Sequence, residues 1–176
     1  MPRIEPETVE ASNPDVCAVF AEIQGAFGMV PNLFRTYACS PPLLEANWNK
    51  VKALMMGGTL RRKCKETIAV LVSKDNMCDY CVAAHQAALR SIGMSEEEIA
   101  YLDTDLQKAG FNSVEEALIG FARRANLDPH TITDAEFAQL RAAGAKDAQI
   151  VEALGVMELF LGFNRFLNTV QADIDF

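Results

Sequence analysis

The sequence predicts an all-α fold on two observations. Apolar residues recur three and four positions apart along most of the chain, the spacing that places them on one face of a helix. Alternating apolar and polar runs bounded by turn residues, which would predict strands, are missing. The chain has 176 residues, 50% of them hydrophobic, which suffices for one substantial core but not for two. We therefore expect a single helical domain over residues 1–176.

Four helices are predicted in the first half of the chain. Gly28 ends the first helix, two prolines open the third, and Gly57 and Gly58 end that one. The Asp75-Asn76 pair ends the fourth and can cap its successor. The expected ranges are 15–27, 33–37, 41–56 and 60–73.

Further helices are predicted in the second half. Ser95 to Glu98 and Thr133 to Glu136 both have the capping-box pattern that starts a helix. Gly93 and Gly144 are typical helix ends. The expected ranges are 77–91, a short helix from 95, 113–126, 133–144 and 147–170.

The most apolar stretch, 153–167, belongs to the last of these helices. Glu158, Asn164 and Arg165 interrupt it, which argues against a membrane span and favours a buried or subunit-interface helix. We expect Glu158 to be buried against Arg165 or across an interface, with a functional carboxylate as the less favoured alternative.

Charge and cysteine content argue against several classes of protein. The net charge of −8 gives no basic footprint for nucleic acid or an anionic membrane. The N-terminal segment is rich in proline and glutamate and does not resemble a secretory signal, so we expect a cytoplasmic protein. The five cysteines are an odd number and do not suggest a structural disulfide framework. Cys17 and Cys64 are expected to be small buried apolar residues.

The main chemical motif is Cys78-Asp79-Tyr80-Cys81, followed by His85. On a helix Cys78, Cys81 and His85 share one stripe, which continues through Ala88 and Ile92 and is expected to face inward. A cysteine thiol is mostly protonated at neutral pH, with a pKa near ~8.5, unless its surroundings stabilise the thiolate. A helix N-terminus and a neighbouring imidazole both do so.

Glu66 lies on the preceding helix, where an antiparallel helix pair would bring it to His85. A carboxylate bonded to the imidazole would fix its tautomer and raise its basicity. The alternative is a surface pair with Arg62, one turn earlier. Zinc is a further interpretation of the CxxC motif, but three candidate ligands are one short of four, and the Cα atoms of Cys78 and His85 would be about 10.5 Å apart on a helix. We therefore expect neither a metal nor another cofactor.

The spacing of these residues resembles a known family. Glu66, eleven residues, Cys78-x-x-Cys81, three residues and His85 match the signature of AhpD-like alkylhydroperoxidases within the carboxymuconolactone decarboxylase family. Further segments resemble the peroxidase-related branch of that family. They are Val30-Pro31-Asn32, Ser40 to Leu44, Asn76-x-Cys78-x-Tyr80-Cys81, Phe121 to Arg124, Thr133-Asp134 and the helix from Phe160 to Phe166.

The resemblance implies an AhpD-like helical fold that forms homo-oligomers through apolar helices, as dimers, trimers or hexamers. It implies that Cys81 attacks a hydroperoxide, that Cys78 donates a proton and then closes the disulfide, and that Glu66 and His85 relay protons. Tyr80 stands where the best-studied members have histidine, and it can still hydrogen-bond. The implied partners are a hydroperoxide and a dithiol reductant, either a lipoyl-bearing or a thioredoxin-like protein.

Other functions stay open at this point. In thioredoxin the first cysteine of the motif is the low-pKa nucleophile, so the residues alone do not choose between Cys78 and Cys81. A general protein dithiol-disulfide oxidoreductase and a non-catalytic redox sensor would both use the same pair. A cofactor-free decarboxylase is the third alternative, although family members of that kind generally lack the two cysteines.

Overall fold

In the computed structural model, which describes residues 1–8, 10 and 13–176, every regular element is a helix. The all-α fold that the sequence predicts is therefore confirmed. The α-helices are α1 (Pro14–Phe27), α2 (Asn32–Tyr37), α3 (Pro41–Val51), α4 (Arg62–Asp75), α5 (Asp79–Ser91), α6 (Glu96–Ala100), α7 (Ser113–Leu127), α8 (Asp134–Ala142) and α9 (Asp147–Val170). A π-helix, η1 (Lys52–Met56), continues α3, and the short 3₁₀ turns η2 (Tyr101–Asp103) and η3 (Pro129–Thr131) follow α6 and α7.

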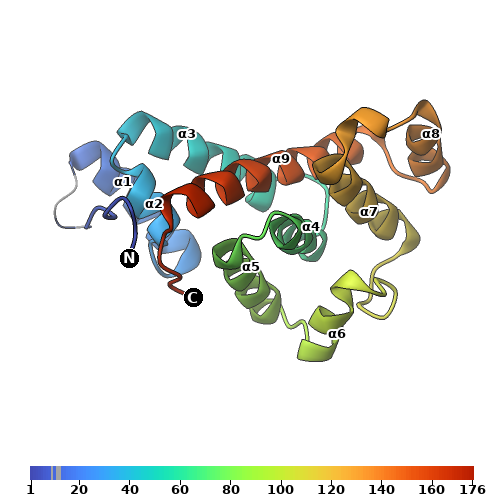
Figure 1. The fold of residues 1–176 in the computed structure, drawn as a ribbon, viewed down its shortest axis with the longest axis horizontal. Coiled ribbons are helices and arrows are strands. Elements are labelled where there is room, and N and C mark those ends of the chain that lie inside the picture. The colour runs from blue at the N-terminus through green and yellow to red at the C-terminus, as the bar shows by residue number, and fades with distance from the viewer. Residues whose placement is uncertain (9, 11–12) are drawn as a thin grey trace.

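Helix α4 lies at the centre of the molecule. Every residue from 64 to 73 is buried, so this helix is surrounded on all sides. Figure 1 shows α9 running along the long axis, with α1 to α3 at one end, α7 and α8 at the other, and α5 beside α4. One continuous cluster of buried apolar residues joins all these parts. The core therefore holds α4 and α5 in a fixed relation.

The predicted helix starts follow ordinary capping chemistry. The Asn13 side chain accepts the backbone N–H of Val16 at 2.9 Å, with Pro14 in the first turn of α1. Ser95 and Glu98 form the predicted capping box before α6, because each side chain bonds the backbone N–H of the other, at 3.2 and 2.8 Å. Gly28 ends α1 with a φ of 78°, a left-handed value that glycine adopts without strain.

The junction between α4 and α5 differs from the expectation of a helix at 77–91. Met77 has a left-handed φ of 53°, its N–H bonds the Lys74 carbonyl, and the N–H of Cys78 bonds the Ser73 carbonyl. This pattern is a Schellman motif, which usually has glycine or asparagine at the left-handed position. Cys78 is thus the N-cap of α5, not part of it, and does not share a helical stripe with Cys81.

The expectation of one regular helix over 41–56 is also corrected. The α-helix stops at Val51, and the π-helix carries the chain on to Met56. A π-turn accommodates an extra residue and is frequent near functional sites. Here it brings Met55 to the wall of the cavity described below.

Three expectations about side-chain burial within the chain are wrong. Glu158 is not buried against Arg165, because it lies on the outer face of α9, where it is 68% exposed and pairs with Lys50 at 2.9 Å. Its burial across a subunit interface stays a prediction. Cys17 is exposed on α1, although Cys64 is buried as expected. Ile92 is 38% exposed, since α5 ends before it and the inward stripe ends with the helix.

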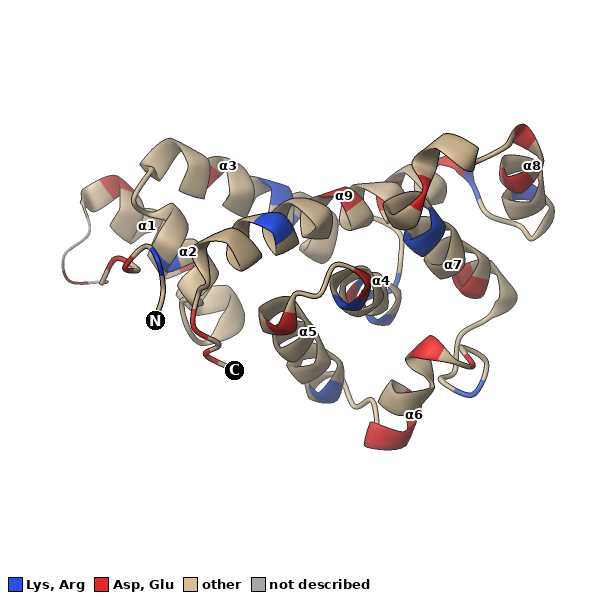
Figure 2. Cartoon of the chain, viewed as in Figure 1, with Lys and Arg blue, Asp and Glu red and all other residues tan. Residues whose placement is uncertain are grey.

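Charged residues of both signs are interspersed over the helices, and the acidic start of α6 is prominent (Figure 2). The ion pair of Lys65 with Glu152 is largely buried, whereas Arg61, which pairs with the buried Glu115, is 57% exposed. Among the described helices, α9 included, none combines the length and apolar character needed to cross a membrane.

Candidate active site

The carboxylate and the imidazole singled out by the sequence are in direct contact. Oε2 of Glu66, on α4, lies 2.6 Å from Nδ1 of His85, on α5. Oε1 of Glu66 accepts a hydrogen bond from Nε of Arg62 at 3.2 Å. The two partners that the sequence left as alternatives are therefore engaged at the same time.

Two opposing effects set the pKa of Glu66. Burial by itself raises it, but the hydrogen bond and charge of His85, together with Arg62, outweigh burial and hold the pKa below the ordinary value of 4.5. The carboxylate is thus ionised at neutral pH and only accepts hydrogen bonds. Nδ1 of His85 is therefore the donor in this contact, which leaves Nε2 to exchange protons with other groups. The edge-to-face contact with Phe160, with centroids 4.3 Å apart, holds the ring in place.

Cys78 and Cys81 are both free thiols and both buried, at 1% and 2% exposure. The thiol and the backbone N–H of Cys81 hydrogen-bond the Cys78 sulfur, and these bonds lower the pKa of Cys78 to about 7 against the opposing effect of burial. The pKa of Cys81 is raised, because Cys81 is the donor in this bond and is buried. When the pair loses a proton near neutral pH, the negative charge is therefore placed on Cys78.

Tyr80 lies between the two thiols in sequence but makes its hydrogen bond elsewhere. Its hydroxyl oxygen accepts the backbone N–H of Leu33 at 3.1 Å, and its ring packs edge-to-face on Phe176. Burial raises the pKa of Tyr80, and the carboxylate of Asp175 adds to this effect. Tyr80 thus anchors the start of α2 and the segment that follows α9 against the site.

A cavity of about 400 Å³ opens on Cys81. Glu66, Arg62 and His85 supply polar groups to its wall, and most of the remaining lining is apolar and aromatic. The aromatic residues are Phe27, Phe34, Tyr80, Phe160, Phe163 and Phe176. Cys78 does not line this cavity, so of the two thiols Cys81 is the one that a bound molecule meets.

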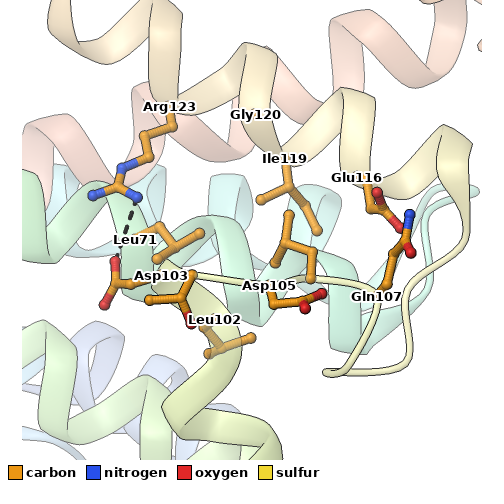
Figure 3. A pocket seen from close by; sticks show the side chains of 11 residues that line it. Leu71, Leu102, Asp103, Asp105, Gln107, Glu116, Ile119, Gly120 and Arg123 are labelled. Carbon is orange, nitrogen blue, oxygen red and sulfur yellow. Dashed lines mark ion pairs between the residues drawn. The ribbon is translucent and has the colours of Figure 1, made fainter.

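A second cavity, of about 430 Å³, lies between α4, α7 and the segment after α6 (Figure 3). Its wall includes Leu71, Ile119 and the ion pair of Asp103 with Arg123. It contains neither a thiol nor an imidazole. Over the part of the chain that is described, no cluster of three or more His, Cys, Asp or Glu side chains has the arrangement of a metal site. The thiol cavity is therefore the candidate active site.

Comparison with known proteins places this site in a family. The model of the carboxymuconolactone decarboxylase family matches residues 41–124. A structure of an alkylhydroperoxidase AhpD core from Rhodospirillum rubrum ATCC 11170 is 30% identical, with 78% of this chain and 98% of that chain covered and a TM-score of 0.56. The chain belongs to the carboxymuconolactone decarboxylase family.

Two further relatives support the AhpD-like resemblance. A peroxidase-related protein with an AhpD core, from Ralstonia eutropha JMP134, is 28% identical, covers 99% of this chain and 92% of its own, and has a TM-score of 0.87. An alkyl hydroperoxide reductase of Mycobacterium tuberculosis (strain ATCC 25618 / H37Rv) is 29% identical over 108 residues, which are 61% of this chain. The match spans about a third, 31%, of that relative's length. The segment matched by the family model contains Glu66, Cys78, Cys81 and His85.

Two polar residues lie beside the thiols, Ser73 and Asn164, and neither was predicted from the sequence as part of the site. Asn164 lies on α9, outside the segment matched by the family model, and is completely buried. Its amide donates to Oγ of Ser73 at 2.9 Å, and its interaction with the two thiols lowers the pKa of each. The available signal was a lone amide within the apolar stretch 153–167, which was interpreted only as evidence against a membrane span.

Proposed function

We propose that this chain is a thiol-dependent hydroperoxide reductase that cycles Cys78 and Cys81 between dithiol and disulfide. One observation carries the proposal: Cys81 faces a largely apolar cavity next to the His85–Glu66 pair, and the thiol of Cys81 also interacts with that of Cys78, which does not line the cavity. A peroxidatic thiol needs access to substrate, a nearby acid or base and a resolving thiol. The kinship with AhpD-like proteins supports the same conclusion.

The first step is attack on the peroxide. Transfer of the Cys81 proton to Cys78 generates the Cys81 thiolate, which attacks the terminal oxygen of the hydroperoxide. An S–O bond forms, the O–O bond breaks, and the alkoxide takes the proton held by Cys78, relayed by His85, and leaves as an alcohol; Cys78 is a thiolate again. Cys81 is then a sulfenic acid. Glu66 holds His85 with Nδ1 as the donor, so that Nε2 carries the proton in transit.

The second step closes the disulfide. The Cys78 thiolate attacks the Cys81 sulfur, the S–O bond breaks, and the hydroxide leaves as water after taking a proton. Overall, two thiols and one hydroperoxide give one disulfide, one alcohol and one water. A dithiol reductant, of the lipoyl or thioredoxin-like class, must then reduce the disulfide. The aromatic lining of the cavity favours an organic hydroperoxide over hydrogen peroxide.

The test is single-turnover peroxide consumption by pre-reduced protein, with thiols counted before and after. Wild type should consume one equivalent and lose two thiols, Cys81→Ser should be inert, and Cys78→Ser should stop at a sulfenic acid that dimedone traps. Cumene hydroperoxide should react faster than hydrogen peroxide. Cys64→Ser is the matched control, because burial raises the pKa of Cys64 to about 12 and keeps it protonated. Sustained activity in Cys81→Ser, or survival of both thiols in wild type, would contradict the proposal.

The other functions considered from the sequence give different outcomes in the same assay. A general dithiol-disulfide oxidoreductase would react with protein disulfides, which the burial of both thiols disfavours. A redox sensor would oxidise once without sustained turnover when a reductant is supplied. A cofactor-free decarboxylase would keep its activity without either cysteine.

Self-association and location stay predictions. We expect a homo-oligomer, and apolar side chains that a partner would cover include Leu43 and Val151, which are 54% and 69% exposed. Light scattering coupled to size-exclusion chromatography measures the state directly. We also expect the protein to be cytoplasmic, where reductants would keep the pair available as a dithiol.

A further inference from the structure

Helix α9 contains a fully buried amide that the steps above do not use. Asn164 is 0% exposed and lies between the buried aromatic residues Phe160 and Phe163 and the buried Leu167. An amide in such surroundings destabilises the fold unless its donors and acceptor are paired. The partners of Asn164 therefore indicate what the residue is for.

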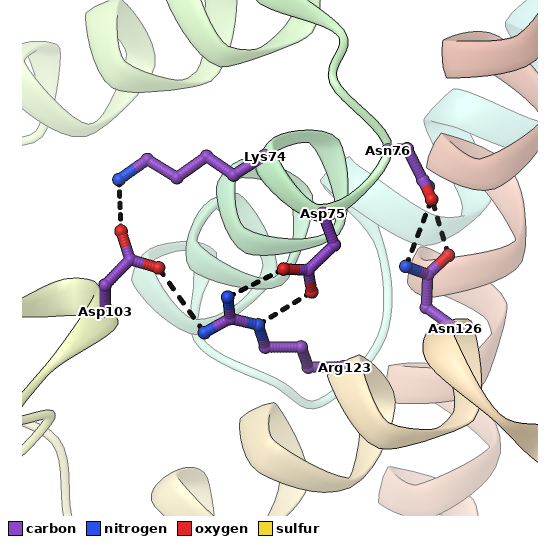
Figure 4. Close-up of polar contacts among 6 residues, drawn as sticks. All are labelled: Lys74, Asp75, Asn76, Asp103, Arg123 and Asn126. Atoms are coloured by element: carbon purple, nitrogen blue, oxygen red, sulfur yellow. Dashed lines mark hydrogen bonds and ion pairs between the residues drawn. The ribbon is translucent and has the colours of Figure 1, made fainter.

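The orientation of this amide is fixed from one side. Oδ1 of Asn164 accepts a hydrogen bond from Nδ2 of Asn76 at 3.0 Å. Asn76 is itself held by a reciprocal pair of hydrogen bonds with Asn126, at 3.0 and 3.2 Å (Figure 4). Asn168 also donates to the backbone oxygen of Asn76 at 3.1 Å. Because its oxygen is engaged with Asn76, Asn164 turns its NH₂ group the other way.

That NH₂ group faces the thiols. It donates to Oγ of Ser73 at 2.9 Å, and its interaction with Cys78 and Cys81 favours the thiolate form of each. A hydrogen bond to a thiolate is stronger than the same bond to a neutral thiol, so a donor at this place favours the charged form. The Asn164 amide lowers the pKa of each thiol, and Ser73 adds to this effect at Cys81.

We propose that Asn164 is a positioning residue for the thiol pair, whose oriented amide stabilises the thiolate on whichever of the two sulfurs carries the charge. A donor that reaches both sulfurs lets the proton move between them while a hydrogen bond to the charge is kept. The place of this residue in turnover rests on the proposed function, but its effect on the thiolate does not.

The experiment measures the thiolate without peroxide. Reduced wild type and Asn164→Leu are titrated by absorbance at 240 nm, and the rate of alkylation by iodoacetamide is followed over the same pH range. Leucine has a similar size and no donor. We expect the midpoint to move up by about one pH unit, which is about tenfold less thiolate at pH 6, because a hydrogen bond to a charged group has about that effect. Asn47→Leu is the control, since the Asn47 amide bonds the Leu43 carbonyl on α3 and should leave the titration unchanged.

A second variant covers the case in which Asn164→Leu does not fold. Asn76→Ser releases the oxygen of Asn164 and lets its amide rotate, so alkylation at pH 6 should slow by about threefold. A folded Asn164→Leu with an unchanged midpoint, or a folded Asn76→Ser with an unchanged rate, would overturn the inference. If Asn164→Leu shifts the midpoint but wild type has no peroxidase activity, the inference about Asn164 stands and the proposed function is rejected.

Discussion

Replacing Glu66 with glutamine tests the proton relay most directly. The variant keeps the size of the side chain and removes the charge that lies 2.6 Å from Nδ1 of His85. A glutamine amide can also donate to Nδ1, which would stabilise the wrong tautomer of the imidazole. Both partners are largely buried, at 6% and 18% exposure, so solvent screens the contact weakly. A hydrogen bond of this kind contributes about 1.5–3 kcal/mol, and its loss corresponds to about a 10- to 150-fold slower reaction.

Rapid-quench trapping of the free thiols during one turnover with cumene hydroperoxide measures the rate of this step. Arg62→Gln is the matched control, because it removes the other partner of Glu66, at 3.2 Å, and leaves the bond to His85 intact. Arg62 is 53% exposed, so we expect less than about a threefold change in that variant. A folded Glu66→Gln variant that reacts within threefold of wild type would refute the assignment of Glu66 to the relay.

Three further predictions follow from the same contacts. Cys81→Ala removes the thiol donor to Cys78, so the pKa of Cys78 should rise from about 7 toward the ordinary value of 9 in a thiolate titration; a midpoint that stays near 7 would contradict this. Lys65→Met removes the cation 2.7 Å from the carboxylate of Glu152, which keeps only its hydrogen bonds from Thr59 and Leu60, and should lower the free energy of unfolding by about 3–5 kcal/mol in urea; a loss below about 1 kcal/mol would show that the pair is dispensable. Because the pKa of Glu66 is lower in the folded chain, the unfolded chain binds its proton first as the pH falls. Stability should therefore decrease below about pH 4.5, and less steeply in Glu66→Gln; equal slopes would exclude this contribution.

The helices and the Glu66–His85 contact could be predicted from the sequence because both depend on local spacing. Apolar periodicity, helix-ending glycines and capping boxes are all patterns of residues close together in the sequence, as at Ser95 and Glu98. A short connection between two helices forces them to pack as neighbours, which brings a residue in the body of the first to one in the body of the second.

Expectations failed where the structure depends on a single backbone angle or on distant elements. Met77 adopts a left-handed conformation usually taken by glycine or asparagine, so nothing in the sequence indicated that Cys78 lies outside α5. Glu158 was expected to be buried against Arg165 or across an interface because it lies in an apolar stretch, but within the chain α9 keeps the face that carries Glu158 exposed. Asn164 meets Ser73 across 91 positions in the chain, a contact that only tertiary packing creates.

The more acidic thiol and the thiol that lines the cavity belong to different cysteines, and the backbone explains both placements. The left-handed Met77 turns the chain so that Cys78 caps α5, where the N–H and the thiol of Cys81 converge on its sulfur and stabilise the charge. Cys81, in the first turn of α5, faces the cavity but holds its proton more tightly. Under the proposed function the charge is stored on the shielded sulfur and passes to the accessible one when a peroxide enters. In that proposed cycle the two sulfurs exchange a single proton, so the contact that lowers the pKa of Cys78 would also be the path by which Cys81 is activated, and it would place Cys78 to close the disulfide afterwards.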